Sequence, residues 1–225
     1  MAKTLALTAI AASIAAFVPQ ARAGVLTYSL NQYVGSGTPT ASPYGTVTLT
    51  SSGSNVNVSV SLAGTEGFVD TKAGDSLLWE MANSPLTLTN LTSGFSVVGG
   101  TNTNDTWTVS SAGNSIHTGG AGYWDYAVTC AGGACGHGGS SAYTGKLNFT
   151  VEGVTLSDFM ANGSGFYFAS DICTQVTDGK CTYGITGDIA GGPSTSVPEP
   201  GTLALFGAGL LGCALVAARR RSWRT

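Results

Sequence analysis

Basic residues are scarce in the body of the chain. Residues 24–196 contain three lysines and no arginine against eleven of the twelve acidic residues, so they carry a net charge of −8, while the whole chain carries −3. Proteins that bind nucleic acid neutralise its phosphates with clustered lysine and arginine. The body has no such cluster, and its composition therefore excludes nucleic-acid binding.

Catalytic motifs are also missing. The chain has two histidines, and neither lies in a nucleophile elbow, a zinc-protease helix or a dinucleotide-binding loop. Two acids facing each other across a cleft could hydrolyse a glycoside, but spacing in the sequence sets no distance between the candidates. Those candidates are Asp125, Glu152, Asp158 and Asp171. We therefore predict a protein that is not an enzyme and needs no cofactor; a secreted enzyme that acts on glycan or peptide is the alternative.

Cysteine is limited to five residues, and Cys213 lies apart from the others in an apolar run. In an exported protein, an even number of cysteines predicts disulfide bonds. The favoured bridges are the two local ones, Cys130 with Cys135 and Cys173 with Cys181. Crossed pairing is the alternative.

The segments between the paired cysteines differ in what they indicate. Thr-Asp-Gly-Lys at residues 177–180 is a hairpin-turn sequence, which would bring the second cysteine pair together. The four-residue gap before Cys135 is loose for zinc even though His137 follows closely. The sequence therefore predicts no metal site.

The N-terminal 23 residues have the pattern of a secretory leader. Lys3 precedes an apolar stretch from Leu5 to Val18, and Ala21-Arg22-Ala23 is the small-x-small pattern of a signal-peptidase site. We expect the mature chain to begin at Gly24. A retained anchor is disfavoured because the apolar stretch is short for a membrane span. The expected partners here are the secretion translocon and signal peptidase.

A distinct segment ends the chain at residues 197–225. Its parts, in order, are Val197, Pro198, Glu199 and Pro200, an uncharged run from Gly201 to Ala218, and Arg219, Arg220 and Arg221 in a basic tail, 219–225. As a helix, the uncharged run would span about 27 Å, close to the bilayer core of about 30 Å. The arginines predict that this end stays in the cytoplasm and that the body lies outside.

This order of features resembles the PEP-CTERM sorting signal, a segment that is also labelled "ice-binding protein C-terminal domain". The resemblance covers only residues 197–225. It implies recognition by an exosortase, a membrane enzyme that cuts near the Pro-Glu-Pro motif. It also implies a transient single-pass membrane protein that ends at the cell surface or in the extracellular matrix. The expected role is that of a non-enzymatic surface or exopolysaccharide-associated protein of a biofilm.

Alternating runs separated by glycine, asparagine, serine and proline predict strands in the body. In residues 56–62 the apolar side chains share one side and the polar ones the other, as in a strand with one wet face. Such runs predict an antiparallel β-sandwich or jelly roll over residues 24–188. The runs are 28–34, 46–50, 56–62, 86–91, 95–98, 106–109, 123–129, 146–151, 165–169 and 182–185.

Two segments of the body are expected to differ from strands. Thr155, followed three residues later by Asp158, has the spacing of a capping box and predicts one or two helical turns over residues 155–160. Residues 189–196 are rich in glycine, proline and serine. They predict a linker between the domain and the membrane.

Two features point to surface contacts. Tyr123, Trp124 and Tyr126 are the candidates for carbohydrate contact, with packing in the core as the alternative. Regular alternation would place Trp124 and Tyr126 on one face and Tyr123 on the other. Thr-x-Thr runs at residues 46–48, 87–89 and 101–103 have no fixed period, so they predict wet strand faces. A carbohydrate- or ice-binding module is a further alternative function.

Overall fold

The structure, a computed structural model, describes residues 24–37, 42–69, 71, 75–82, 96–98, 106–131, 142–181 and 184–195. These residues form twelve β-strands and one 3₁₀ turn, Leu156–Asp158, and contain no α-helix. The strands are β1 (Val25–Tyr33), β2 (Gly45–Ser52), β3 (Asn55–Leu62), β4 (Gly67–Phe68), β5 (Asp75–Met81), β6 (Ser96–Val98), β7 (Thr106–Thr118), β8 (Gly122–Ala131), β9 (Lys146–Val151), β10 (Phe159–Met160), β11 (Phe168–Cys173) and β12 (Thr186–Thr195).

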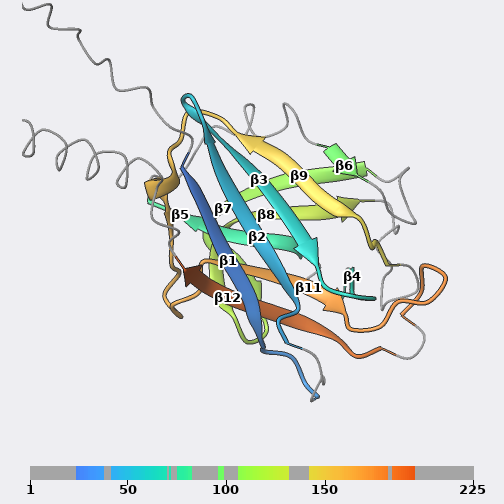
Figure 1. Ribbon diagram of the computed structural model, residues 1–225. Coiled ribbons are helices and arrows are strands. Elements are labelled where there is room, and N and C mark those ends of the chain that lie inside the picture. Colours follow the sequence, from blue (N-terminus) through green and yellow to red (C-terminus); the bar gives the residue numbers. More distant parts are fainter. Residues whose placement is uncertain are drawn as a thin grey trace, which may run out of the picture.

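The strands make one antiparallel sheet that curls over itself. Its order is β6-β9-β3-β2-β1-β12-β11-β5-β8-β7, with β10 beside β5 and β4 beside β11. Strands β1, β2 and β3 form one layer, and β5, β7 and β8 lie behind it (Figure 1). Across the core, the ring centroid of Trp79 in β5 lies 5.4 Å from that of Phe149 in β9. The predicted antiparallel β fold is confirmed, and its two layers belong to one curled sheet.

Alternation of apolar and polar residues explains which side of each strand faces the core. Val56, Val58 and Val60 of β3 are at most 1% exposed and join the main core, while Asn57 and Ser59 point outward. Successive side chains of a strand point to opposite faces, so this pattern buries one face only. The strand predicted at residues 56–62 is confirmed.

Aromatic rings fill much of the space between the layers. Trp79 stacks on Tyr126 of the neighbouring strand β8 with ring centroids 5.4 Å apart, and Tyr28 meets Phe168 edge to face at 4.9 Å. Each such pair contributes about 0.5–1.5 kcal/mol beyond the burial of its area. The large rings therefore fix how the two layers pack.

The linker predicted at residues 189–196 is wrong for residues 189–195. These residues belong to β12, which pairs with β1 on one side and with β11 on the other. The small residues have a packing reason, because a Cβ atom on Gly191 would lie 1.7 Å from the carbonyl oxygen of Ser29. The domain therefore extends to Thr195 instead of ending at residue 188.

Two further elements depart from the expected pattern. Strand β5 was not predicted because six of its seven residues are buried, so it lacks alternation. The helix expected at residues 155–160 is a single 3₁₀ turn, in which the carboxylate of Asp158 accepts hydrogen bonds from the backbone N–H and hydroxyl of Thr155 at 2.7 and 2.8 Å. Phe159 then buries its ring in the core, and the chain continues as β10.

Among the residues that the structure describes, no helix is long and apolar enough to cross a membrane. Several predicted segments lie outside the described residues. They are the leader with Ala21 and Ala23, the motif residues 197–200, the apolar run 201–218 and the arginines at 219–221.

Candidate functional site

The fold splits the predicted aromatic cluster. Tyr123 is 56% exposed, whereas Trp124 and Tyr126 are 0% exposed and so cannot serve as surface contacts. Tyr126 lies in the main core, and Trp124 lies in a second apolar cluster. The expectation that these two share a face is wrong, because the β7–β8 pairing shifts register between Ser111 and Ile116. Four residues of β7, 112–115, stand here against one residue of β8, so regular alternation does not hold across this point.

The second apolar cluster lies under the tip of the β7–β8 hairpin. There, Trp124 clusters with Ala127 of its own strand and with Leu78, Ala169 and Ala190 of β5, β11 and β12. The backbone N–H of Gly119 donates to the carboxylate of Asp188 at 3.1 Å, and the side-chain amide of Asn162 donates to the carbonyl of Ala121 at 2.7 Å. These contacts hold the hairpin tip against the sheet.

Tyr123 is the member of the aromatic cluster that a ligand can reach. Its ring centroid lies 4.6 Å from that of His117, its cross-strand partner on β7. An exposed tyrosine combines an apolar ring with a polar hydroxyl, which suits contact with a sugar. The hairpin therefore presents one exposed aromatic ring on a fixed support.

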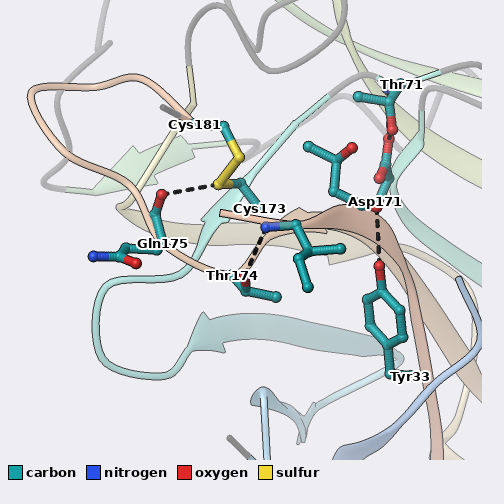
Figure 2. Close-up of a disulfide and its surroundings, with 9 residues drawn as sticks. Tyr33, Thr71, Asp171, Cys173, Thr174, Gln175 and Cys181 are labelled. Atoms are coloured by element: carbon teal, nitrogen blue, oxygen red, sulfur yellow. Dashed lines mark hydrogen bonds between the residues drawn. A yellow bond between two sulfur atoms is a disulfide. The ribbon is translucent and has the colours of Figure 1, made fainter. Parts of the chain in front are cut away.

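The second predicted cysteine pair forms a disulfide bond between Cys173 and Cys181 (Figure 2), with Cα atoms 5.8 Å apart. Asp178 and Gly179 have φ angles of 50° and 72°, the conformation of a type I′ turn. Thr177 and Lys180 exchange two backbone hydrogen bonds of 2.9 and 3.0 Å across this turn. The prediction from the turn sequence is confirmed.

Other predicted site residues fall partly outside the described residues. Cys130 lies in β8, but Cys135 and His137 lie outside the described residues. The disulfide bond between Cys130 and Cys135 therefore stays a prediction. Gly24, the expected first residue of the mature chain, directly precedes β1. Cleavage there would thus leave the first strand intact.

Carboxylates gather on the outer side of the layer formed by β12, β11, β5 and β8. Four of them directly precede or follow a residue of the main core, and Asp75 joins them by accepting a hydrogen bond from Thr129 at 2.7 Å; all are buried or half-buried. We call this set the acidic face; it consists of Asp75, Glu80, Asp125, Asp171 and Asp188. Within the described part of the chain, no group of three or more histidine, cysteine or acidic side chains is placed to hold a metal ion.

Glu80 and Asp125 are a carboxyl pair within the acidic face. Burial, together with the charge of the neighbouring Asp125 to which Glu80 hydrogen-bonds, raises the pKa of Glu80 to about 7. Two carboxyl oxygens can share a hydrogen bond only when one is protonated. Sequence reasoning named Asp125 but missed Glu80, which lies between the core residues Trp79 and Met81 of the unpredicted strand β5.

A second pair lies farther along the acidic face, where Asp171 and Asp188 are directly opposite on β11 and β12. Thr71 donates its backbone N–H and its hydroxyl to the Asp171 carboxylate at 2.5 and 2.6 Å, and Figure 2 shows Tyr33 nearby. Burial raises the pKa of Asp188, and the N–H of Gly119 partly offsets this. These contacts tie loops to the sheet.

The opposite layer carries an uncharged polar array on its outer side. Cross-strand partners line up across β1, β2, β3 and β9, as in the row Thr27, Thr48, Ser59 and Asn148. We call this array the uncharged face; its members are Thr27, Ser29, Thr46, Thr48, Thr50, Asn57, Ser59, Ser61, Asn148 and Thr150. Sheet geometry spaces these side chains about 4.8 Å apart between strands and about 6.8 Å along each strand.

The sequence pattern indicated the wet side of each strand, but not this alignment. The Thr-x-Thr run at residues 46–48 lies on β2 as a wet strand face, as predicted, and the hydroxyl of Thr150 donates to the Asn57 side chain across β3 and β9 at 2.9 Å. The runs at residues 87–89 and 101–103 lie outside the described residues. Register between strands, which a single sequence does not encode locally, assembles the uncharged face.

The comparison with protein families identifies the C-terminal segment. Residues 196–221 match the family model described as the PEP-CTERM protein-sorting motif, which confirms the resemblance seen in the sequence. This motif implies export, a location at the cell surface or outside the cell, and processing by an exosortase, which is a membrane enzyme. No curated protein and no solved structure matches the chain.

Proposed function

We propose that this chain is a non-enzymatic surface protein that enters the membrane transiently, loses its tail to an exosortase and then associates with exopolysaccharide. The observation that carries the sorting part is the PEP-CTERM motif at residues 196–221. The leader at residues 1–23 and the apolar run 201–218, which Arg219 follows, support a chain that meets the membrane at both ends during export.

The uncharged face supports the contact with exopolysaccharide. Sugars present many hydroxyl groups, which threonine, serine and asparagine can meet as donors and acceptors. One such hydrogen bond contributes only about 0.5–1.5 kcal/mol, so binding requires many in parallel. A regular array that extends over four strands provides them. Because the body carries a net charge of −8, a neutral polysaccharide suits it better than an anionic one.

The Glu80 and Asp125 pair favours a structural role over glycoside hydrolysis. A hydrogen bond holds two oxygens about 2.5–3.0 Å apart, whereas retaining glycosidases separate their carboxyl groups by about 5 Å and inverting ones by more. Both residues belong to neighbouring strands of the sheet, and the side chain of Asp125 is only 3% exposed. This arrangement supports the proposal of a protein without catalysis.

The sorting part is tested by cell fractionation. The full chain and a variant with Pro198→Ala, Glu199→Ala and Pro200→Ala are expressed in a host that has an exosortase, and the intact mass of each product is measured. The wild-type product should begin at Gly24 and lack Arg219–Arg221, while the variant should keep them and stay in the membrane fraction. A released wild-type product that still carries the arginines would contradict the proposal.

The polysaccharide part is tested by placing one charge on the uncharged face. Thr48, which has Thr27 and Ser59 as cross-strand partners, is changed to Glu; the matched control is Ser110→Glu on the exposed side of β7. We expect Thr48→Glu to weaken co-sedimentation of the full chain with neutral polysaccharide at least tenfold, and Ser110→Glu to leave it unchanged. Equal binding by both variants would refute the role of this face.

A further inference from the structure

The last strand of the domain occupies the middle of the sheet. Residues of β12 pair with β1 from Ile189 to Thr195 and with β11 from Thr186 to Gly191. Ile189 and Ala190 are 0% exposed. The sorting motif begins at residue 196. The segment that directly precedes the motif is therefore a central strand and not a spacer.

Strand β12 also joins the two halves of the sheet. One half is β6-β9-β3-β2-β1 and the other is β11-β5-β8-β7, and among the described residues no other strand pairs with both. Without β12, the backbone groups of β1 and β11 would lose their partners on that side. Unpaired backbone groups at a buried position each cost about 1–3 kcal/mol.

The two ends of the domain leave it at the same place. Strand β1 begins at Val25, directly after the expected leader, and Thr27 lies opposite Thr195. The start of β1 and the end of β12 lie on the same side of the molecule (Figure 1). The leader and the sorting tail therefore attach to neighbouring strand ends.

From these observations we infer that β12 is the closing strand of the exported domain, so that folding is completed only after residue 195 has crossed the membrane and the exosortase cuts only beyond Thr195. This inference rests on the proposed function, because it takes residues 197–225 to be the membrane segment that the exosortase removes. A cut before Thr195 would shorten a strand that holds the two halves together. The folded domain thus sets the N-terminal limit of the cleavage site.

Two adjacent glycines of β12 provide a matched pair of variants. A Cβ atom on Gly191 would lie 1.7 Å from the backbone oxygen of Ser29, whereas a Cβ atom on Gly192 would meet nothing within 4 Å. Backbone of a neighbouring strand cannot move aside as a flexible side chain can. Gly191→Ala therefore prevents β12 from seating between β1 and β11, and Gly192→Ala does not.

The test uses the full chain exported in a host with an exosortase. Protease is added to cells whose inner membrane is intact and whose outer layers have been removed. The rate at which the exported body is digested is compared between each variant and wild type. Gly191→Ala should be digested at least tenfold faster than wild type, and Gly192→Ala should equal wild type. Equal resistance of the two variants would overturn the inference, because the sheet would then close without a seated β12.

The intact mass of the released wild-type product tests the limit on cleavage. A product that ends at or beyond Thr195 supports the inference, and one that ends earlier overturns it. This outcome differs from failure of the proposed function, in which the tail stays attached whatever residue stands at 191. The Pro198→Ala, Glu199→Ala, Pro200→Ala variant should keep its tail and remain as resistant to protease as wild type.

Discussion

The carboxyl pair of Glu80 and Asp125 should make the stability of this domain depend on pH. In the folded state Glu80 has a pKa of about 7, compared with 4.5 for an ordinary glutamate, so it keeps its proton up to about that pH. A raised folded pKa means that the folded state binds the proton more tightly. The domain therefore loses stability as the pH rises from 4.5 to 7. Replacing Glu80 with glutamine, which stays neutral, removes this loss.

The size of the effect follows from the difference in pKa. One pKa unit corresponds to about 1.4 kcal/mol, so a difference between 4.5 and about 7 corresponds to about 3 kcal/mol. Water that reaches the half-buried carboxyl screens part of this, which leaves about 2 kcal/mol. Glutamine also preserves a donor for Asp125. We expect Glu80→Gln to gain about 2 kcal/mol over wild type at pH 8 and almost nothing at pH 4.5.

Unfolding of the full chain in mild detergent by urea, followed by near-ultraviolet circular dichroism, measures this difference. The buried indoles of Trp79 and Trp124 report on loss of tertiary packing. Asp178→Asn is the control, because Asp178 is exposed and asparagine tolerates its positive φ of 50°. Glu66, whose pKa burial also raises to about 7, leaves a smaller slope of the same sign in the variant.

Two results would refute this reasoning. A Glu80→Gln variant that is less stable than wild type at pH 8 would mean that the ionised carboxylate is needed in the folded state. A wild-type free energy of unfolding that rises between pH 5 and pH 8 would show that carboxyls with lowered pKa values dominate the titration.

Other predictions concern the disulfide and the hairpin. Replacing Cys173 and Cys181 with serine should cost about 2.5 kcal/mol, because the bridge closes a short loop of the unfolded chain; an unchanged urea midpoint would contradict this. Trp124→Ala should cost about 3–5 kcal/mol because Trp124 is 0% exposed, while Tyr123→Ala at 56% exposure should change the unfolding free energy by less than about 0.5 kcal/mol. Equal losses of unfolding free energy in the two variants, measured by thermal unfolding, would contradict the burial of Trp124 and the exposure of Tyr123.

Local sequence patterns predicted those parts of the fold whose causes are local. Alternation at residues 56–62 marked β3 because one face is buried and the other is wet. The turn at residues 177–180 brought Cys173 and Cys181 together because Asp-Gly adopts the positive φ angles that the turn requires. Patterns failed where a strand is buried on both faces, as in β5, or where it is built of small residues, as in β12.

The candidate sites show the same division. Glu80 carries no sequence signal as the partner of Asp125, because the two meet only through the register of β5 and β8. Trp124 and Tyr126 are buried in different clusters, next to an irregular β7–β8 pairing that periodicity in the sequence cannot reveal.

By itself, the sequence determined the route of this protein, because a sorting motif is read as a linear string at residues 196–221 and needs no partner elsewhere in the chain. It also determined the β class of the body, since the period of apolar residues is a local property. Only the tertiary structure decided that Thr195 ends a central strand and that threonines from separate strands form the uncharged face. Both depend on which strands pair and in what register, and that is decided by packing between residues far apart in the chain.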